Sequence, residues 1–150
     1  MSGTYNHILY HIVFSTKERI PVLEHEFRKE LYKYFGGICI GEGCDLVAIG
    51  GTADHVHLLL RAKPIHKLSE LMQKIKGNTS KWANEKQFIK CRFAWQAGYG
   101  AFSVSISQME KVILYIQNQE DHHRKRNFQE EFIDLLQKHR VEYNLEYLWK

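Results

Sequence analysis

Residues 54–60 have the sequence Asp-His-Val-His-Leu-Leu-Leu, which is typical of a buried β-strand. Side chains alternate between the two faces of a strand, so His55 and His57 are expected to point the same way. Two neighbouring neutral imidazoles can supply half of the ligands of a divalent metal site. They can also be ordinary strand histidines that are half exposed, and the pattern alone leaves both interpretations open.

The rest of the chain predicts one α+β domain that covers residues 1–150. Hydrophobic periodicity and turn residues predict strands at 5–15, 44–50, 55–62 and 93–105, and helices at 24–35, from 68 to about 84, from Ser107 onward and at 128–139. Gly36-Gly37 is expected to close the first helix, and Ser107 with Glu110 matches a capping box that opens the third. This order is ferredoxin-like (RRM-like): an antiparallel sheet with helices on one face, followed by C-terminal helices. The other face of the sheet is then expected to be free to bind a partner.

The composition is that of a globular protein. Of the 150 residues, 44% are hydrophobic and 13% aromatic, and no apolar run approaches the ~20 residues of a membrane span. The N-terminus shows no basic region followed by an apolar stretch, so no signal peptide is expected. The three cysteines are odd in number and lack CxxC spacing, which disfavours a disulfide framework or a cysteine zinc site. We therefore expect a cytoplasmic protein without membrane contact.

Positive charge is concentrated in residues 63–92, where eight Lys or Arg residues stand against two acidic ones, although the whole chain carries only +4. Such a segment suits a polyanionic partner such as nucleic acid, and it is equally consistent with a solvated helix face. The candidate DNA-contacting residues are Lys74, Lys76, Lys81 and Arg92, together with Arg124 and Lys125 of a short basic cluster.

The helix that starts at Ser107 is expected to present a tyrosine on the side away from the core. Its apolar stripe, which should pack on the sheet, consists of Met109, Val112, Ile113 and Ile116. The opposite stripe consists of Lys111, Tyr115, Gln119 and His122, which are spaced so that they share one face. Tyr115 is either a nucleophile that forms a covalent intermediate or a partly buried aromatic with its hydroxyl at the surface. Lys111 and His122 are candidate supporting residues.

Gln119 connects this helix with the histidine pair. Its amide oxygen suits Mg²⁺ or Mn²⁺, and with His55 and His57 it would complete three ligands. Coordination positions would remain open for a phosphate oxygen, and Tyr115 would lie near that phosphate, one helical turn from Gln119. The set therefore indicates attack by a tyrosine on a phosphodiester. Asp54 is a candidate to orient an imidazole or to join the metal site.

Four separated stretches match the motifs of one known family. They are Tyr-His-Ile-Val-Phe-Ser-Thr-Lys at 10–17, Gly-Gly-Thr-Ala-Asp-His-Val-His-Leu-Leu at 50–59, Trp-Gln-Ala-Gly-Tyr-Gly-Ala-Phe-Ser-Val at 95–104, and Tyr-Ile-Gln-Asn-Gln at 115–119 followed by His122-His123. In these motifs, and over nearly its whole length, the chain resembles the single-tyrosine (Y1) transposases of the IS200/IS605 family. These enzymes belong to the HUH nucleases, which are named after a histidine, a hydrophobic residue and a histidine.

The resemblance implies a ferredoxin-like fold, a homodimer, Mg²⁺ or Mn²⁺ as cofactor, and single-stranded DNA with hairpin ends as substrate. It also implies a transposase in which Tyr115 attacks DNA, forms a 5′-phosphotyrosine and releases a 3′-OH. In such dimers the tyrosine helix of one subunit can serve the histidine pair of the other. Two alternatives stay open: a domesticated, repeat-associated tyrosine transposase, and a non-catalytic ferredoxin-like module that binds nucleic acid and has structural histidines.

Overall fold

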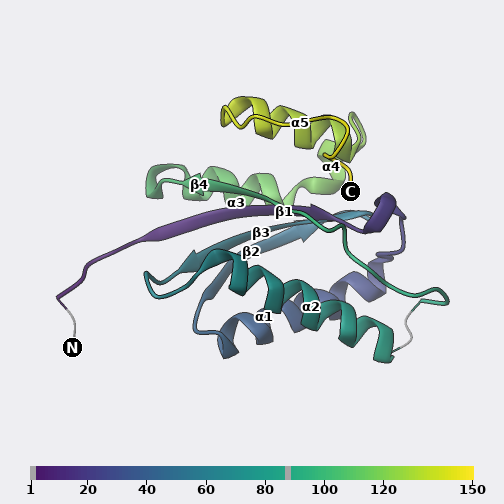
Figure 1. The fold of residues 1–150 in the computed structure, drawn as a ribbon, viewed down its shortest axis with the longest axis horizontal. Coiled ribbons are helices and arrows are strands. Elements are labelled where there is room, and N and C mark those ends of the chain that lie inside the picture. The colour runs from purple at the N-terminus through teal and green to yellow at the C-terminus, as the bar shows by residue number, and fades with distance from the viewer. Residues whose placement is uncertain (1–2, 87–88) are drawn as a thin grey trace.

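The structure is a computed structural model that describes residues 3–86 and 89–150. Its centre is a four-stranded antiparallel sheet in the order β2-β3-β1-β4, with helices on both sides (Figure 1). The strands are β1 (Ile8–Ser15), β2 (Asp45–Gly51), β3 (His55–Ala62) and β4 (Gly100–Val104). Since β3 lies between β2 and β1, with Val13 opposite His57, the histidine pair stands in the interior of the sheet.

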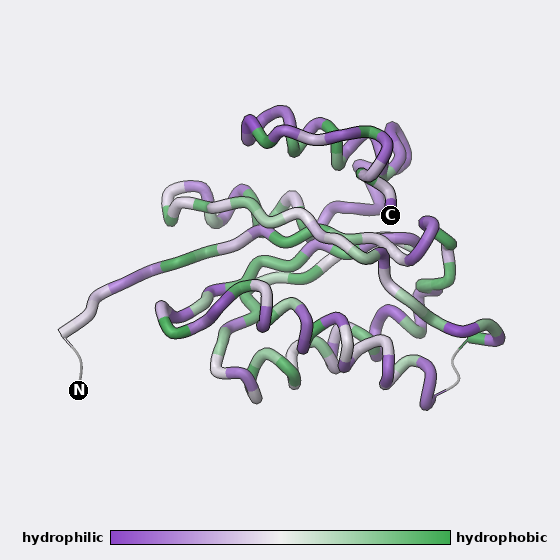
Figure 2. Tube along the Cα trace, in the orientation of Figure 1, coloured by the Kyte–Doolittle hydropathy of each residue, from purple (hydrophilic) through white to green (hydrophobic). Residues whose placement is uncertain are grey.

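The first face of the sheet is covered by α1 (His25–Gly41) and α2 (Leu68–Lys86). Even-numbered residues of β1 and β3 point into this layer and form the main hydrophobic core with the two helices. Its fully buried members include Ile12, Phe14, Val56, Leu58, Leu60, Phe35 and Ile75. Figure 2 shows hydrophobic residues gathered along the strands, while hydrophilic residues are frequent on the helices. Burial of this apolar surface is the main source of the stability of the fold.

The second face of the sheet is covered by α3 (Met109–Gln117), α4 (Gln119–His123) and α5 (Phe128–Lys138). Two apolar clusters attach these helices. The α3 cluster is built around Leu9, Ala48, Leu59 and Ile116, with Met109, Val112 and Ile113 packed against it. The α5 cluster consists of Val13, Phe102, Phe128, Phe132, Leu135 and Leu136.

The prediction of a free second face is therefore wrong, whereas the ferredoxin-like α+β fold with added C-terminal helices is confirmed. The physical reason is that an amphipathic helix needs an apolar surface for its stripe, and this face of the sheet provides one. The predicted apolar stripe of α3 does pack on the sheet.

Three predicted boundaries also differ. Helix α1 continues through Gly36-Gly37 to Gly41, because Cys39 in its last turns is buried in the core. Ser107 lies in a 3-10 turn, η2 (Ile106–Gln108), and α3 starts without a side-chain cap; a capping box opens α5 instead, between Asn127 and Glu130. Strand β4 has only five residues, since the chain before it is irregular apart from a bridge between Trp95 and Thr16.

The three cysteines are free thiols, with Cys39 and Cys44 buried and Cys91 exposed. A second 3-10 turn, η1 (Lys17–Arg19), follows β1. Among the residues that the structure describes, none of the helices combines the length and the apolar character that crossing a membrane requires.

Strand β2 and helix α3 approach each other closely at Gly50. A Cβ atom placed on Gly50 would lie 2.1 Å from the carbonyl oxygen of Ile116, which is far inside van der Waals contact. Only a glycine allows the backbone of α3 to come so near the sheet at this point.

Gly50→Ala is expected to lower the free energy of unfolding by about 1–3 kcal/mol, the usual cost of overpacking, because β2 or α3 must shift. Gly37→Ala is the matched control. Gly37 lies within α1, and a Cβ atom added there would have no atom within 4 Å. Because alanine favours the helix more than glycine does, this substitution should stabilise the protein by roughly 0.5–1 kcal/mol. Urea denaturation followed by circular dichroism measures both changes. If Gly50→Ala were as stable as the wild type, the close packing of α3 on the sheet would be wrong.

Candidate active site

Three histidines lie side by side on the second face of the sheet, between the α3 cluster and the α5 cluster. His55 and His57 are fully buried, and His11 of β1 is 4% exposed. Nε2 of His11 lies 2.8 Å from Nδ1 of His57, and their rings stack with centroids 5.1 Å apart. The predicted common orientation of His55 and His57 is confirmed by their shared contacts with Glu131. They are not half-exposed strand histidines, which was the other interpretation.

Helix α5 brings a carboxylate to this row. Glu131 is fully buried, and its Oε1 lies 2.8 Å from Nε2 of His57 and 3.6 Å from Nε2 of His55. Glu131 is not among the site residues predicted from the sequence, although the sequence contains a signal for it. It lies at helical spacing on the same stripe as Phe128, Phe132 and Leu135, and an acidic residue on an apolar stripe needs polar partners once it is buried.

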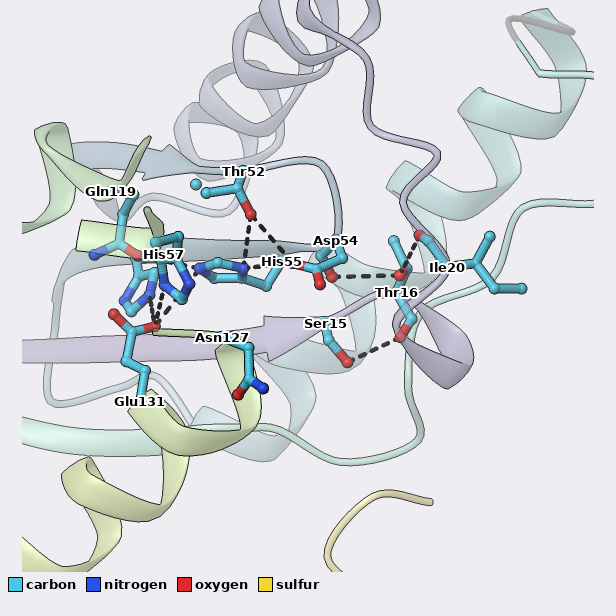
Figure 3. Close-up of polar contacts among 12 residues, drawn as sticks. Ser15, Thr16, Ile20, Thr52, Asp54, His55, His57, Gln119, Asn127 and Glu131 are labelled. Atoms are coloured by element: carbon cyan, nitrogen blue, oxygen red, sulfur yellow. Dashed lines mark hydrogen bonds and ion pairs between the residues drawn. The ribbon is translucent and has the colours of Figure 1, made fainter. Parts of the chain in front are cut away.

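Polar partners at both ring nitrogens set the orientation of His55 (Figure 3). Nδ1 lies 2.8 Å from Oδ1 of Asp54, and Nε2 lies 3.1 Å from Oε1 of Gln119. Because the carboxylate of Asp54 can only accept, Nδ1 carries a proton, and Nε2 faces the oxygen of Gln119 at hydrogen-bond distance. The amide of Gln119 is held this way round because its Nε2 donates to the carbonyl of Tyr115.

His123 of α4 adds another imidazole. Its Nε2 lies 3.0 Å from Oε1 of Glu131, yet it is buried without an aligned hydrogen-bond partner. The ligand atoms of His55, His57, His123 and Glu131 all lie within 4.8 Å of one another. Three imidazoles and a carboxylate, with one ring nitrogen that lacks a hydrogen-bond partner, fit a divalent metal ion. The sequence indicated His55, His57 and Gln119 as ligands, and it did not indicate His123 or Glu131.

Burial and hydrogen bonding set the protonation states of the cluster. Burial lowers the pKa of His11 to about 3 and, against the attraction of Glu131, the pKa of His57 to about 4. Burial alone would raise the pKa of Glu131, but its contacts with His123 and His57 outweigh this effect and hold that pKa well below the usual range. At neutral pH His57 is therefore neutral and Glu131 is charged. Because the carboxylate can only accept, the proton of His57 lies on Nε2, and it would have to leave this nitrogen for Nε2 to bind a metal ion.

Tyr115 lies half-buried at the edge of the cluster. Its hydroxyl donates a hydrogen bond to Oε2 of Glu131, and its ring centroid lies 5.7 Å from that of His57. The ring of His122 packs against it at a centroid distance of 4.8 Å. Burial, together with the negative charge of Glu131, raises the pKa of Tyr115, so the hydroxyl stays protonated at neutral pH. The structure thus brings the predicted nucleophile and the predicted histidine pair together within one chain.

Comparison with known proteins identifies the family. Residues 4–119 match the family model described as "Transposase IS200 like". The chain belongs to the IS200-like transposase family. It is 26% identical over 117 residues to the ISDra2 transposase TnpA of Deinococcus radiodurans, a match that covers 75% of this chain and 84% of the relative. It is also 29% identical over 116 residues to the transposase for insertion sequence element IS200 of Salmonella typhimurium, covering 73% of this chain and 75% of the relative.

Solved structures agree with this membership. A crystal structure from Deinococcus radiodurans, provisionally described as a transposase, superposes with a TM-score of 0.64 at 29% identity and covers 79% of this chain and 95% of that one. A REP-associated tyrosine transposase bound to a REP hairpin shares the fold, with a TM-score of 0.57 at 13% identity and a coverage of 77% and 70%. The match to the family model ends at Gln119, so His123 and Glu131 come from the segment beyond it.

In this transposase the predicted DNA-contacting residues of α2 have different surroundings. The ammonium of Lys76 is already engaged, because it donates to the carbonyls of residues 96–98 at 2.7–3.2 Å. Lys74 pairs with Glu42 at 2.9 Å on an exposed surface. Lys76, Lys81 and Arg92 all line a groove of about 890 Å³ between α2 and the segment before β4, and Nζ of Lys81 lies 3.9 Å from Oε1 of Glu85.

The remaining predicted residues lie near the C-terminal helices. Asp54 contacts Nδ1 of His55, and His122 contacts Tyr115. Lys111 is exposed on α3. Arg124 and Lys125 are exposed after α4, where Arg124 lies 3.5 Å from Asp121.

The buried histidines make the stability of the protein pH-dependent. The pKa of His11 is about 3 and that of His57 about 4, against 6.5 for an unperturbed histidine. The unfolded chain therefore binds more protons than the folded chain below pH 6.5. This contribution to stability is complete above pH 6.5 and is lost as the pH falls towards the folded values.

His11→Gln is expected to reduce the loss of unfolding free energy between about pH 7 and pH 5, a window in which unfolded carboxylates stay ionised. Urea denaturation at several pH values, with EDTA present to exclude metal ions, measures this slope. His7→Gln is the control, because His7 is exposed and should leave the wild-type slope unchanged. Parallel pH curves for His11→Gln and the wild type would refute the assignment.

Proposed function

We propose that this transposase is a metal-dependent DNA transesterase that cleaves and rejoins single-stranded DNA at hairpin-marked ends through a 5′-phosphotyrosine link. The observation that carries the proposal is the hydrogen bond from Tyr115 to Glu131, a member of the buried histidine cluster. The hydroxyl of Tyr115 lies beside side chains that can hold a Lewis acid, which supports its assignment as the nucleophile. Family membership supports DNA as the substrate. The REP hairpin bound by a protein of the same fold makes hairpin DNA the first substrate to test.

The proposed cofactor is Mg²⁺ or Mn²⁺. His55 and His57 would hold it through their Nε2 atoms and Gln119 through Oε1, with His123 and Glu131 as further donors. When bound, such an ion supplies a Lewis acid that polarises a phosphate oxygen. Asp54 and His11 contact the ring nitrogens on the far side of the two strand histidines and hold the rings in place.

In the proposed step, the phenolic oxygen of Tyr115 attacks the phosphorus of a phosphodiester and forms an O–P bond. The bond between phosphorus and the 3′ oxygen breaks, and the 3′ oxygen leaves with its electron pair. It gains the proton that the phenol loses, so that a free 3′-OH results. Oε2 of Glu131 accepts the hydrogen bond of Tyr115 and therefore lies next to the proton that the phenol loses. Attack by a 3′-OH on the phosphotyrosine reverses the step and rejoins a strand.

The predicted homodimer and the predicted cytoplasmic location remain part of the proposal. Tyr115 contacts the cluster of its own chain, which supports attack within one chain; a site shared between subunits would require α3 to leave this contact. Free cysteines and a DNA substrate are consistent with the cytoplasm.

For DNA contacts, the groove lined by Lys81 and Arg92 is the strongest candidate of the predicted set, because both cations face a cavity.

Tyr115→Phe is expected to abolish the covalent protein–DNA adduct, because the attacking oxygen is removed. The measurement is a denaturing gel after incubation of the protein with Mn²⁺ and a panel of single-stranded hairpin oligonucleotides. EDTA should also remove the adduct from the wild type. Tyr147→Phe serves as the control, because Tyr147 is 59% exposed in the C-terminal tail and should leave the adduct unchanged. Adduct formation by Tyr115→Phe would assign the nucleophile to another residue.

Asp54→Asn is expected to weaken Mn²⁺ binding about ten- to hundredfold, because the carboxylate that orients His55 is lost. Calorimetric titration of the metal-free protein measures the affinity without any reaction. Asp45→Asn is the matched control, since Asp45 is exposed on β2 and outside the cluster. Equal affinities for the two variants would show that Asp54 does not support the metal site.

A further inference from the structure

A second cavity lies beside Tyr115 and next to His11, which contacts His57 of the cluster. It has a volume of about 530 Å³ and lies between the end of β4, α3 and α5. Tyr115 and His11 line one side of it, and Arg126, Asp134, Lys138 and His139 line another. A strand of DNA that reaches Tyr115 must pass a solvent-filled space next to that side chain, and this cavity provides one.

Arg126 is the cation of this cavity that lies nearest to the reaction. It sits in the turn between α4 and α5, and its side chain is 32% exposed. Its charge acts on Tyr115: it favours the ionised phenol and opposes the effect of burial on the pKa of Tyr115. The preceding basic residues, Arg124 and Lys125, are exposed and do not line the cavity. Of the three consecutive basic residues, only Arg126 faces the nucleophile.

Asp134 holds the guanidinium of Arg126. Nη1 of Arg126 lies 3.2 Å from Oδ2 of Asp134, and the same oxygen lies 2.9 Å from Nζ of Lys138. A guanidinium has five N–H donors in a planar fork, so one ion pair leaves donors free for a second anion. Arg126 is therefore restrained at the cavity wall and still able to bind an anionic ligand.

We propose that Arg126 binds the phosphate that Tyr115 attacks; this inference rests on the proposed function. An arginine fork matches two phosphate oxygens. As the tyrosine O–P bond forms and the P–O3′ bond breaks, negative charge increases on the non-bridging oxygens, and a fixed cation stabilises this charge. Arg126 gains and loses no proton in this step. The residue lies beyond the part of the chain that matches the family model.

The test measures the single-turnover rate of adduct formation on a hairpin oligonucleotide that the wild type attacks, with Mn²⁺ present. Arg126→Ala should slow adduct formation about 10²–10³-fold, the range found when one charge-stabilising donor is removed. Arg126→Lys should retain part of the rate, and added guanidinium ions should partly restore Arg126→Ala. Asp134→Asn, which removes the ion pair and keeps the guanidinium, should stay within a few-fold of the wild type. Calorimetric Mn²⁺ affinity should be unchanged in all variants.

A purely structural role of Arg126 predicts a different pattern. If the ion pair with Asp134 only stabilises the turn before α5, Asp134→Asn should lose as much rate as Arg126→Ala, and guanidinium ions should restore nothing. That result, or a wild-type rate for Arg126→Ala, would overturn the inference and leave the proposed function standing. If Arg126→Ala fails to fold, Arg126→Lys compared with Asp134→Asn makes the same distinction. Absence of any adduct with the wild type would overturn the proposed function and this inference together.

Discussion

The buried charge of Glu131 is the constraint on which the site depends. A carboxylate without access to water costs several kcal/mol unless hydrogen-bonded partners compensate it. Glu131 is fully buried; it forms hydrogen bonds with His57 of β3 and Tyr115 of α3, and Nε2 of His123 on α4 lies 3.0 Å from its Oε1. One side chain on α5 therefore connects the sheet with all the helices on its second face. Displacement of any of these elements would leave a buried polar atom without its partner.

Apolar packing on both sides keeps this polar region in place. The α3 cluster anchors the helix that carries Tyr115, and the α5 cluster anchors the helix that carries Glu131. At Gly50 the backbone of β2 lies against the carbonyl of Ile116, the residue after Tyr115, so the height of the tyrosine above the sheet is determined by backbone contact. The reacting groups thus stand on helices and strands and not on loops, which is the arrangement that holds a site most accurately.

Short-range patterns were sufficient to predict much of the fold and half of the site. The alternation at His55 and His57 and the single helical turn between Tyr115 and Gln119 depend only on local geometry, and the order of strands and helices followed from periodicity. His11 and Glu131 could not be placed in this way. The contact of His11 with His57 requires the pairing of β1 with β3, and Glu131 meets His57 across 74 positions of the chain. Lys76 looked like a surface cation, because only the path of residues 96–98 reveals that its ammonium is engaged.

The site is divided along the sequence at Gln119. The histidine pair, the tyrosine and the glutamine belong to the segment that matches the family, while His123 and Glu131 belong to the segment after it. The two segments meet along one buried contact region, because His57 and Tyr115 of the first contact Glu131 of the second. A chain that stopped at Gln119 would leave these polar groups without their partner and would expose Val13 and Phe102, which α5 covers in the α5 cluster. The segment that matches the family therefore depends for its buried polar contacts on a tail that lies outside the match.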